Sequence, residues 1–238
     1  MIIEGACMSD NDNYSRGESC GTCEGFSVNA PESAASFKKG HIVRFGSYSQ
    51  GADGHKLPIE WLVLDSSGNE ALLISRHGLD CMPYHRVWDD ITWENCDLRK
   101  WLNSDFLKEA FSEEDIDRIK ISELRNGGHF LSVAGTGTRV RVFCLSIAEA
   151  EQYFGDDDEE RQCRPTKYAE NRGTFADDSS GCCYWWLRSP GFYPGDASHV
   201  LIDGMVSLDG CYVADCEVAV RPALRIICEK QSADLTAD

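Results

Sequence analysis

Apolar residues in this sequence gather in two dense runs near its C-terminal end. The first run, residues 183–187, reads Cys-Tyr-Trp-Trp-Leu, and the second covers residues 218–227. Three shorter segments lie between them, at 199–202, 205–208 and 211–214. The pairs Asp203-Gly204 and Asp209-Gly210 separate these segments, and such a pair suits a tight hairpin turn because glycine has no Cβ and aspartate tolerates the left-handed region. The pattern predicts an antiparallel meander with buried outer runs and an exposed middle.

Three further strands are predicted in the N-terminal half of the chain. Residues 41–45 alternate between apolar and polar, as one strand would. Residues 58–65 and 71–75 are apolar at almost every position, and the sequence Ser-Ser-Gly-Asn at 66–69 joins them into a hairpin. Strands that are apolar on both faces are typical of a central place in a sheet.

Helical spacing predicts several short helices in the middle of the chain. Apolar residues recur at intervals of three and four from residue 98 to 111, and we expect the pair Asn103-Ser104 to divide this stretch into two helices, with Ser104 capping the second. A further turn is expected at 112–115, where acidic residues suit the positive end of the helix dipole. One more short helix is expected within 163–169.

A strand followed by a capped helix is predicted after residue 138. Residues 139–145 have strand character, and Ser146 and Glu149 have the spacing of a capping box, which predicts a helix as far as Phe154. The acidic run at 156–160 offers oxygen ligands for calcium, but it lacks the spacing of a dedicated loop, so we interpret it as a solvated loop. The irregular stretch 78–96 is expected to pack against the core through its aromatic residues.

The distribution of residue types predicts one main domain between two terminal segments. We expect a disordered or loosely attached arm at 1–36, a single domain at 37–228 and a C-terminal tail at 229–238. Within the arm, Cys20-Gly21-Thr22-Cys23 has the spacing of half a zinc site or of a redox pair, or it is simply two thiols on a flexible segment.

The charge of the chain excludes some classes of partner. A formal net charge of −17 over 238 residues disfavours nucleic acid and anionic membrane surfaces, because both are bound through lysine and arginine. No apolar run approaches the roughly 20 residues of a membrane-spanning helix. Residues 1–7 lack a basic segment and a long apolar segment, so we expect no export signal, and a cytoplasmic or phage-particle location rather than secretion.

The chain contains 12 cysteines, an even number that would allow disulfide pairing in an oxidising compartment. Their spacing does not resemble a disulfide framework, and Cys182 and Cys183 are adjacent. We therefore expect reduced thiols that serve mainly as small buried apolar residues.

Five motifs of this chain resemble those of an uncharacterised bacterial domain family. They are Phe45-Gly46-Ser47-Tyr48, residues 58–64 (Pro-Ile-Glu-Trp-Leu-Val-Leu), residues 98–103 (Leu-Arg-Lys-Trp-Leu-Asn), residues 185–191 (Trp-Trp-Leu-Arg-Ser-Pro-Gly) and residues 220–224 (Val-Arg-Pro-Ala-Leu). The resemblance covers about residues 37 to 228.

That family is similar to a branch of the C-type-lectin fold, which formylglycine-generating enzymes and the variable proteins of diversity-generating retroelements share. The resemblance implies an α+β, C-type-lectin-like fold with mixed or antiparallel sheets and two or more flanking helices. It also implies that the N- and C-terminal strands pair, which would place residues 41–45 beside 218–227.

The resemblance also implies that the C-terminal region is a candidate for diversification. Retroelement variable proteins change residues by adenine mutagenesis, typically at asparagine codons that can never become Lys, Gln, Glu, Met or Trp. Within residues 192–216 only Met205 belongs to that excluded set. Turn-rich hairpins disfavour the same long side chains, so both explanations stay open.

These observations predict a ligand-binding module whose partner is a protein or another surface ligand. The expected ligand-binding residues are Tyr184, Trp186, Phe192, Tyr193, Asp196, His199, Leu201, Met205, Leu208, Tyr212 and Asp215. Aromatic side chains with small polar neighbours are typical of binding surfaces. For Tyr184, Trp185, Leu187, Val200 and Val206 a place in the core is the favoured interpretation, so Tyr184 belongs to both groups. Arg188 and Arg221 are expected in buried salt bridges.

Two other functions fit the sequence. A copper-dependent oxidase of the formylglycine-generating kind would use a cysteine pair, for which Cys211 with Cys216 or Cys182 with Cys183 are candidates. A structural domain of a phage or cell-surface particle would use the same C-terminal surface for assembly contacts. We predict no catalytic residue, resident metal or cofactor, because no cluster of histidine and carboxylate indicates a general base or nucleophile.

Overall fold

The hairpin of β2 (Lys56–Ser67) and β3 (Glu70–Ser75) organises the first of two five-stranded sheets. The strands pair antiparallel across a turn at Gly68, which has a φ of 64°. The computed structural model describes residues 37–127, 131, 135–155 and 157–228. β3 is the middle strand of the first sheet. Every residue of β3 after the first is buried, which confirms the prediction from its continuous apolar sequence.

The first sheet has the order β1-β2-β3-β12-β7. The remaining strands are β1 (Ile42–Ser49), β12 (Ala223–Ile227) and β7 (Val142–Phe143). The expected pairing of the N- and C-terminal strands is wrong: β1 and β12 share the sheet, but β2 and β3 lie between them. The reason is local, because β2 and β3 follow β1 through short connections and leave the free edge of β3 for β12, where Leu224 lies opposite Leu73.

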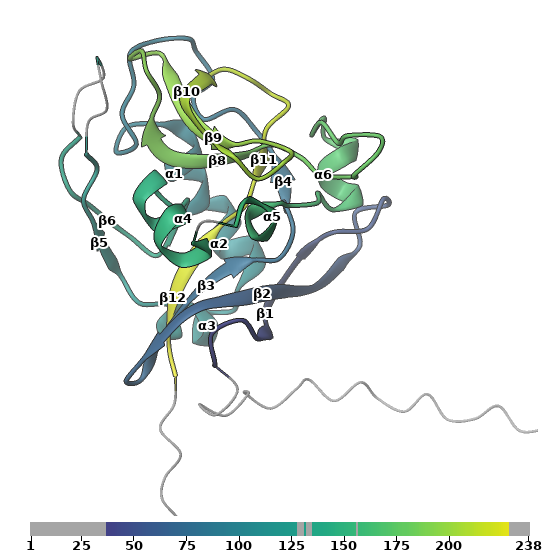
Figure 1. Ribbon diagram of the computed structural model, residues 1–238. Helices are drawn as coiled ribbons and strands as arrows, with labels where there is room; N and C mark the ends of the chain where they lie inside the picture. Colours follow the sequence, from purple (N-terminus) through teal and green to yellow (C-terminus); the bar gives the residue numbers. More distant parts are fainter. Residues whose placement is uncertain (1–36, 128–130, 132–134, 156, 229–238) are drawn as a thin grey trace, which may run out of the picture. The chain divides into compact units, whose positions relative to one another are not determined.

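The second sheet has the order β10-β9-β8-β11-β4. Its strands are β8 (Trp185–Pro190), β9 (Asp196–Val200), β10 (Val206–Tyr212), β11 (Ala219–Val220) and β4 (Asp80–Cys81). Pairing is antiparallel except between β8 and β11, which run parallel. Figure 1 shows this sheet above the first one, and a separate hairpin of β5 (Ser122–Leu124) and β6 (Thr138–Val140) beside them.

The chain crosses from the second sheet to the first at Arg221-Pro222. β11 ends at Val220 and β12 begins at Ala223, so a short segment joins strands of different sheets. Proline has no N–H to donate and ends a strand ladder at that point. The Val-Arg-Pro-Ala-Leu motif is therefore the crossing between the sheets.

The meander of the second sheet differs from the prediction in one respect. Asp203-Gly204 forms the expected turn between β9 and β10, with a φ of 92° at Gly204. Asp209-Gly210 was expected to form a second turn, but β10 runs straight through it and the register with β9 shifts between Ser207 and Cys211. β10 has two more residues than β9 between these pairs, and Gly210, with a φ of 78°, lets the strand accommodate them as a bulge instead of reversing the chain.

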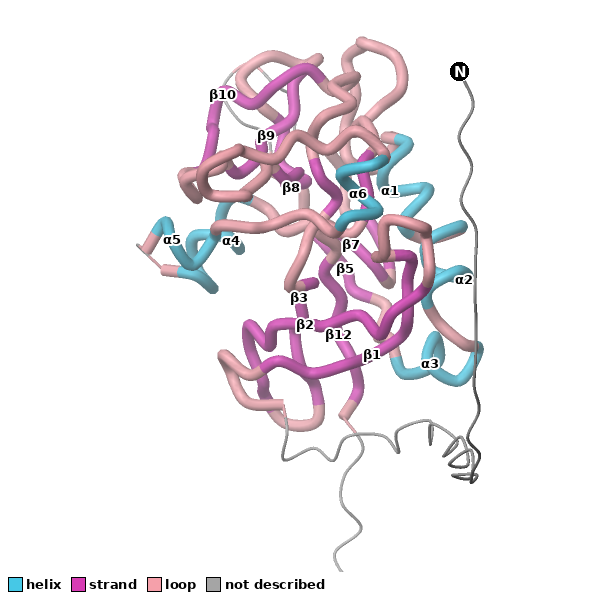
Figure 2. Tube along the Cα trace, turned by 90° about the vertical axis from the view of Figure 1, so that its right-hand side faces the viewer, coloured by secondary structure: helices cyan, strands magenta, loops and turns pink. Residues whose placement is uncertain are grey.

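In the described part of the chain, six short helices lie between the strands. They are α1 (Asp97–Leu102), α2 (Asp105–Ala110), α3 (Glu113–Arg118), α4 (Ile147–Phe154), α5 (Asp158–Arg161) and α6 (Lys167–Asn171). Figure 2 shows α1, α2 and α3 along one side of the strands, and α4 and α5 on the opposite side.

The predicted starts of α3 and α4 are confirmed, whereas the helix expected within 163–169 begins only at Lys167 and runs to Asn171. Ser146 and Glu149 form the expected capping box of α4, and Ser112 and Asp115 form another at α3. The chain breaks between α1 and α2 as expected, but Ser104 does not cap α2: its hydroxyl donates to the carbonyl of Lys100 in α1. The run expected to be a solvated acidic loop contains the single turn of α5.

Buried tryptophans connect the two sheets to their surroundings. Trp61, Trp185 and Trp186 are fully buried, and each indole N–H donates to a backbone carbonyl, at Phe45, Arg161 and Met82 respectively. A buried indole that keeps its hydrogen bond contributes apolar area without an unpaired donor. The densest aromatic run in the sequence is therefore core.

The two predicted buried arginines behave differently. Arg188 pairs with Glu149, as expected, and also donates to the carbonyl of Cys144. Arg221 forms no ion pair within the described residues. Its guanidinium donates to the carbonyls of Ser75 and Arg161 and lies 4.8 Å from the ring centre of Trp185. The expected salt bridge of Arg221 is thus replaced by carbonyls and an aromatic face.

The described residues all lie within one structural unit. The predicted N-terminal arm at 1–36 with Cys20 and Cys23, and the predicted tail at 229–238, lie outside the described residues.

Candidate functional site

The exposed end of the second sheet carries the candidate site. The β8–β9 connection, residues 191–195, and the edge strand β10 lie beside residues 85–91. The backbone N–H of His85 donates to Val213, and the N–H of Ile91 donates to Pro194, at 2.8 and 3.3 Å. These two bonds fix both ends of residues 85–91, while residues 86–90 between them are all exposed. A short segment is thus held by its backbone and presents its side chains to solvent.

Trp88 is the largest of these exposed side chains. It is 68 % exposed, and its ring lies edge-on to Tyr212, with 5.6 Å between the ring centres. A Cβ at Gly195 would come within 2.6 Å of the indole nitrogen of Trp88. The absence of a side chain at Gly195 therefore lets the indole lie against the backbone of the β8–β9 connection.

Three exposed aromatic residues surround two adjoining hollows. Tyr193 and Tyr212 are 58 % and 64 % exposed. The first hollow, of about 510 Å³, is lined by Trp88, Asp89, Asp90, Tyr193, Pro194, Gly195, Asp196 and Tyr212. The second, of about 460 Å³, is lined by Trp88, Tyr212, Ala214 and Asp215. Trp88 and Tyr212 form the wall between the two hollows, and we call these lining residues together the aromatic surface.

The charge of the aromatic surface is entirely acidic. Asp89, Asp90, Asp196 and Asp215 line the hollows, and no lysine, arginine or histidine does. Burial raises the pKa of Asp196 above its ordinary value. Burial also lowers the pKa of His199, although the nearby charge of Asp215 acts in the opposite direction. Aromatic faces combined with carboxylates suit a ligand that is both apolar and cationic.

The structure brings together four of the predicted binding residues: Tyr193, Asp196, Tyr212 and Asp215 all line the hollows. Phe192 is half-buried, with its ring 4.9 Å from that of Tyr193. Leu201, Met205 and Leu208 do not line either hollow, although Met205 and Leu208 are exposed.

Three other predicted binding residues lie away from the aromatic surface. Trp186 is fully buried, so it is not accessible for the expected ligand-binding role, and His199 is 7 % exposed, so its expected exposure is wrong. At these positions β8 and β9 are buried on both faces of the sheet. The alternation of side chains along a strand predicts one buried and one exposed face instead. Tyr184 is half-buried, stacked on Phe175 and edge-on to His199.

The sequence reasoning missed the contribution of residues 88–90. Trp88 was expected to pack against the core, as Tyr84 and Trp93 do. The sequence does indicate that Trp88 is exposed, because Asp89 and Asp90 follow it directly and two adjacent carboxylates are seldom buried.

The cysteines proposed for copper are placed differently from one another. Cys182 and Cys183 are buried, Cys211 is half-buried and Cys216 is exposed. Burial raises the pKa of Cys211 to about 12, which keeps this thiol protonated at neutral pH. Among the residues that the structure describes, no three His, Cys, Asp or Glu side chains are grouped so that they could hold a metal ion.

Comparison with known protein families gives one match. Residues 68–227 match the model of a family described as a domain of unknown function, DUF6273. The chain belongs to the DUF6273 family. The DUF6273 match extends from the β2–β3 turn to the end of β12, so it includes the whole second sheet and every residue of the aromatic surface. This confirms the expectation of an uncharacterised domain family.

Searches of curated proteins and of solved structures found no match. The architecture itself is mixed α+β with mostly antiparallel sheets and short helices. In the described part of this DUF6273 protein, no helix is both long and apolar enough to cross a membrane.

Proposed function

We propose that this DUF6273 protein is a binding module and that the aromatic surface recognises a protein partner through a basic, partly apolar segment. The observation that carries this proposal is the grouping of Trp88, Tyr193 and Tyr212 around two hollows whose only charged lining groups are carboxylates. Tyrosine and tryptophan dominate the binding energy of many protein interfaces, because they bury a large area at small entropic cost.

The acidic residues at the rim favour a cationic partner. Asp89 and Asp90 are exposed, and Asp196 and Asp215 are half-buried at the sides of the hollows. Such charges steer a basic segment toward the surface and disfavour an acidic one. Lysine or arginine side chains also interact favourably with the faces of tryptophan and tyrosine.

The rigid support of the surface fits a binding role. The backbone bonds of His85 and Ile91 hold the segment of Trp88 against the sheet, and Val213 donates to the carbonyl of Gly195 at 3.1 Å. A preorganised surface loses little conformational entropy on binding.

Peptide selection tests the proposal. A random peptide library is selected on the wild-type chain, and the affinity of enriched peptides is measured by fluorescence polarisation for a Trp88→Ala/Tyr212→Ala variant. Enriched peptides should carry lysine or arginine next to apolar residues. Their affinity should fall at least about tenfold in the double variant, as expected for central aromatic residues of an interface.

The matched control is Leu57→Ala. Leu57 is 43 % exposed on β2 and lies outside the aromatic surface. Peptides should bind this variant like the wild type, and the melting temperatures of all variants should agree closely. Equal binding to the double variant, or enrichment of acidic peptides, would refute the proposal.

We extend the proposal to a C-type-lectin-like module resembling the variable proteins of diversity-generating retroelements. In support, the window 192–216 supplies Tyr193, Asp196, Tyr212 and Asp215 to the aromatic surface. The test is the DNA beside the coding sequence: a reverse transcriptase with a near-identical repeat, carrying adenines at the codons of these residues, is expected. Flanking DNA without such a repeat would contradict diversification, but it would not affect the proposal that the aromatic surface binds a partner.

A further inference from the structure

A separate cavity of about 600 Å³ lies between the β5 hairpin, α4, β8 and β12. Four cationic side chains line it, from Lys120, Arg125, Arg188 and Arg225, against two carboxylates, from Glu123 and Glu149. This excess of positive charge stands out in a chain whose net charge is −17. We call it the Arg225 cavity.

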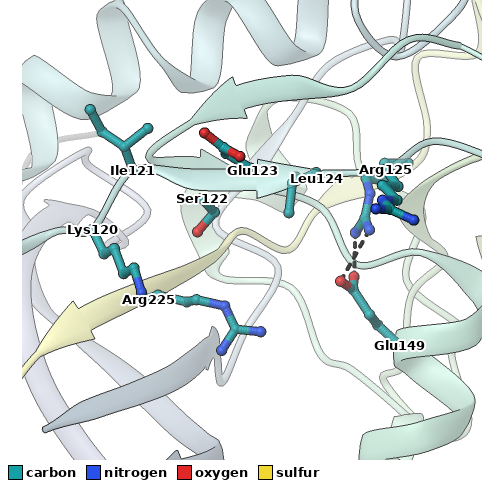
Figure 3. Close-up of a pocket in the computed structure, with 9 residues that line it drawn as sticks. Lys120, Ile121, Ser122, Glu123, Leu124, Arg125, Glu149 and Arg225 are labelled. Atoms are coloured by element: carbon teal, nitrogen blue, oxygen red, sulfur yellow. Dashed lines mark hydrogen bonds and ion pairs between the residues drawn. The ribbon is translucent and has the colours of Figure 1, made fainter.

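Two of the cations have internal partners. Lys120 pairs with Glu70, and Arg188 pairs with Glu149 on the cavity wall. Neither Arg125 nor Arg225 has a carboxylate within ion-pair distance among the described residues. Figure 3 shows Arg225 with Ser122 and Lys120 on one side of the cavity and Arg125 on the other, above Glu149, whose dashed lines mark its ion pair with Arg188.

The position of Arg225 is set by the backbone of β12. Leu224 and Ile226 on either side of it are fully buried, so the side chain of Arg225 points to the opposite face of the strand. The N–H of Lys120 donates to the carbonyl of Arg225 at 2.8 Å, which fixes this strand against the start of the β5 hairpin. Arg225, which is half-buried as a residue, therefore lines the cavity from a strand that is paired on both edges.

Ser122 supplies an independent observation. The residue is 5 % exposed, it lines the cavity, and its hydroxyl has no hydrogen-bond partner among the residues that the structure describes. A buried hydroxyl without a partner costs free energy, as does a half-buried cation without a counter-ion. A single ligand that accepts hydrogen bonds would satisfy both groups.

We infer that the Arg225 cavity binds a small molecule through an oxyanion, a carboxylate or phosphate group held by Arg225 and Arg125 with Ser122 donating to it. The planar guanidinium matches both groups because it offers two parallel N–H donors. A cavity of this size lies within the range of small-molecule sites. The strongly negative chain as a whole repels long polyanions, so the ligand is a small molecule rather than a nucleic acid.

Thermal unfolding of the full-length chain tests the inference with two probes, inorganic phosphate and succinate, each titrated against sodium chloride at equal ionic strength. Specific binding to the native state raises the melting temperature in a saturable way. At least one probe should do so for the wild type, and the stronger of the two shows whether the site prefers phosphate or carboxylate.

The deciding variants are Arg225→Gln and Ser122→Ala, with Arg44→Gln as the control. Arg44 is exposed on β1, pairs with Glu60 and lies outside the cavity. Arg225→Gln should weaken probe binding by about tenfold or more, as loss of a charged hydrogen bond does. Ser122→Ala should weaken it less, and Arg44→Gln should bind like the wild type.

Stability without the probe separates binding from a structural role. Removal of an unpaired cation should leave the melting temperature of Arg225→Gln unchanged or raise it. A marked decrease would mean that Arg225 is structural and would overturn the inference. If Arg225→Gln does not fold, the same measurements are made on Arg125→Gln, since Arg125 is exposed. An equal response of all variants, or no saturable response to either probe, would also overturn the inference.

Discussion

Replacement of Glu149 should be among the most destabilising single changes in this protein. Its carboxylate accepts a hydrogen bond from the N–H of Ser146 at 2.9 Å, which completes the capping box of α4. The same carboxylate pairs with Arg188, whose side chain is 5 % exposed, while that of Glu149 is 20 % exposed. One side chain thus stabilises a helix start and compensates a buried charge.

The two roles can be separated by the choice of substitution. Glu149→Gln keeps a side chain that suits the capping box but removes the charge, which should cost about 3 kcal/mol because a buried guanidinium is left uncompensated. Glu149→Ala also loses the cap and should cost about 1 kcal/mol more. Since domains are stable by only about 5–15 kcal/mol, either change removes a large share of the total.

Urea unfolding followed by circular dichroism measures these free energies. The double variant Glu149→Gln/Arg188→Met should be more stable than the sum of the single changes predicts, because it removes both partners of the pair. Glu123→Gln is the control: its ion pair with Arg139 is exposed and should contribute less than about 1 kcal/mol. A cost for Glu149→Gln no larger than that of the control, with additive single changes, would refute the reasoning.

Three further outcomes are expected. Burial raises the pKa of both Cys96 and Cys211 to about 12, so the native protein retains protons that the unfolded chain loses above about pH 9. Its free energy of unfolding should therefore fall as pH rises past 9, by about 1.4 kcal/mol per pH unit for each group. Urea unfolding of Cys211→Ala should show a weaker dependence of this free energy on pH. The same pH dependence in Cys211→Ala and the wild type would contradict the burial of Cys211. The exposed Cys216 should react with a maleimide before the buried Cys96, as site-resolved mass spectrometry would show, and the reverse order contradicts the burial of Cys96. Gly195→Ala should displace the Trp88 indole and alter its fluorescence with little effect on the melting temperature, because a new Cβ would lie 2.6 Å from the indole nitrogen; an identical spectrum contradicts the contact.

Local patterns predicted much of the fold. The apolar sequences of β2 and β3 predicted a central hairpin, and the spacing of Ser146 and Glu149 predicted the start of α4. These features depend on residues close in sequence. Strand order depends on which edge is free when the chain returns, and the pairing of β12 with β3 rather than β1 has no local signature.

The candidate site was harder to predict for the same reason. Tyr193 and Tyr212 were identified because exposed aromatic residues stood in a turn-rich stretch. Trp88 lies more than 100 positions before Tyr193, and only the backbone bonds of His85 and Ile91 bring its segment to the sheet. Trp186 was misplaced because its strand is covered on both faces, which depends on the packing of Tyr84 against it, with 5.7 Å between the ring centres.

The crossing at Arg221-Pro222 has a consequence for synthesis of the protein. β12 lies between β3 and β7 in the first sheet. During synthesis, β3 and β7 therefore lack the strand that joins them until residues up to Ile227 have left the ribosome. Until then the edge of β3 has unpaired N–H and carbonyl groups, which are prone to pair with other chains. The nascent polypeptide therefore depends on a late, long-range closure, and its folding should be slow and sensitive to chaperones that shield the waiting edge.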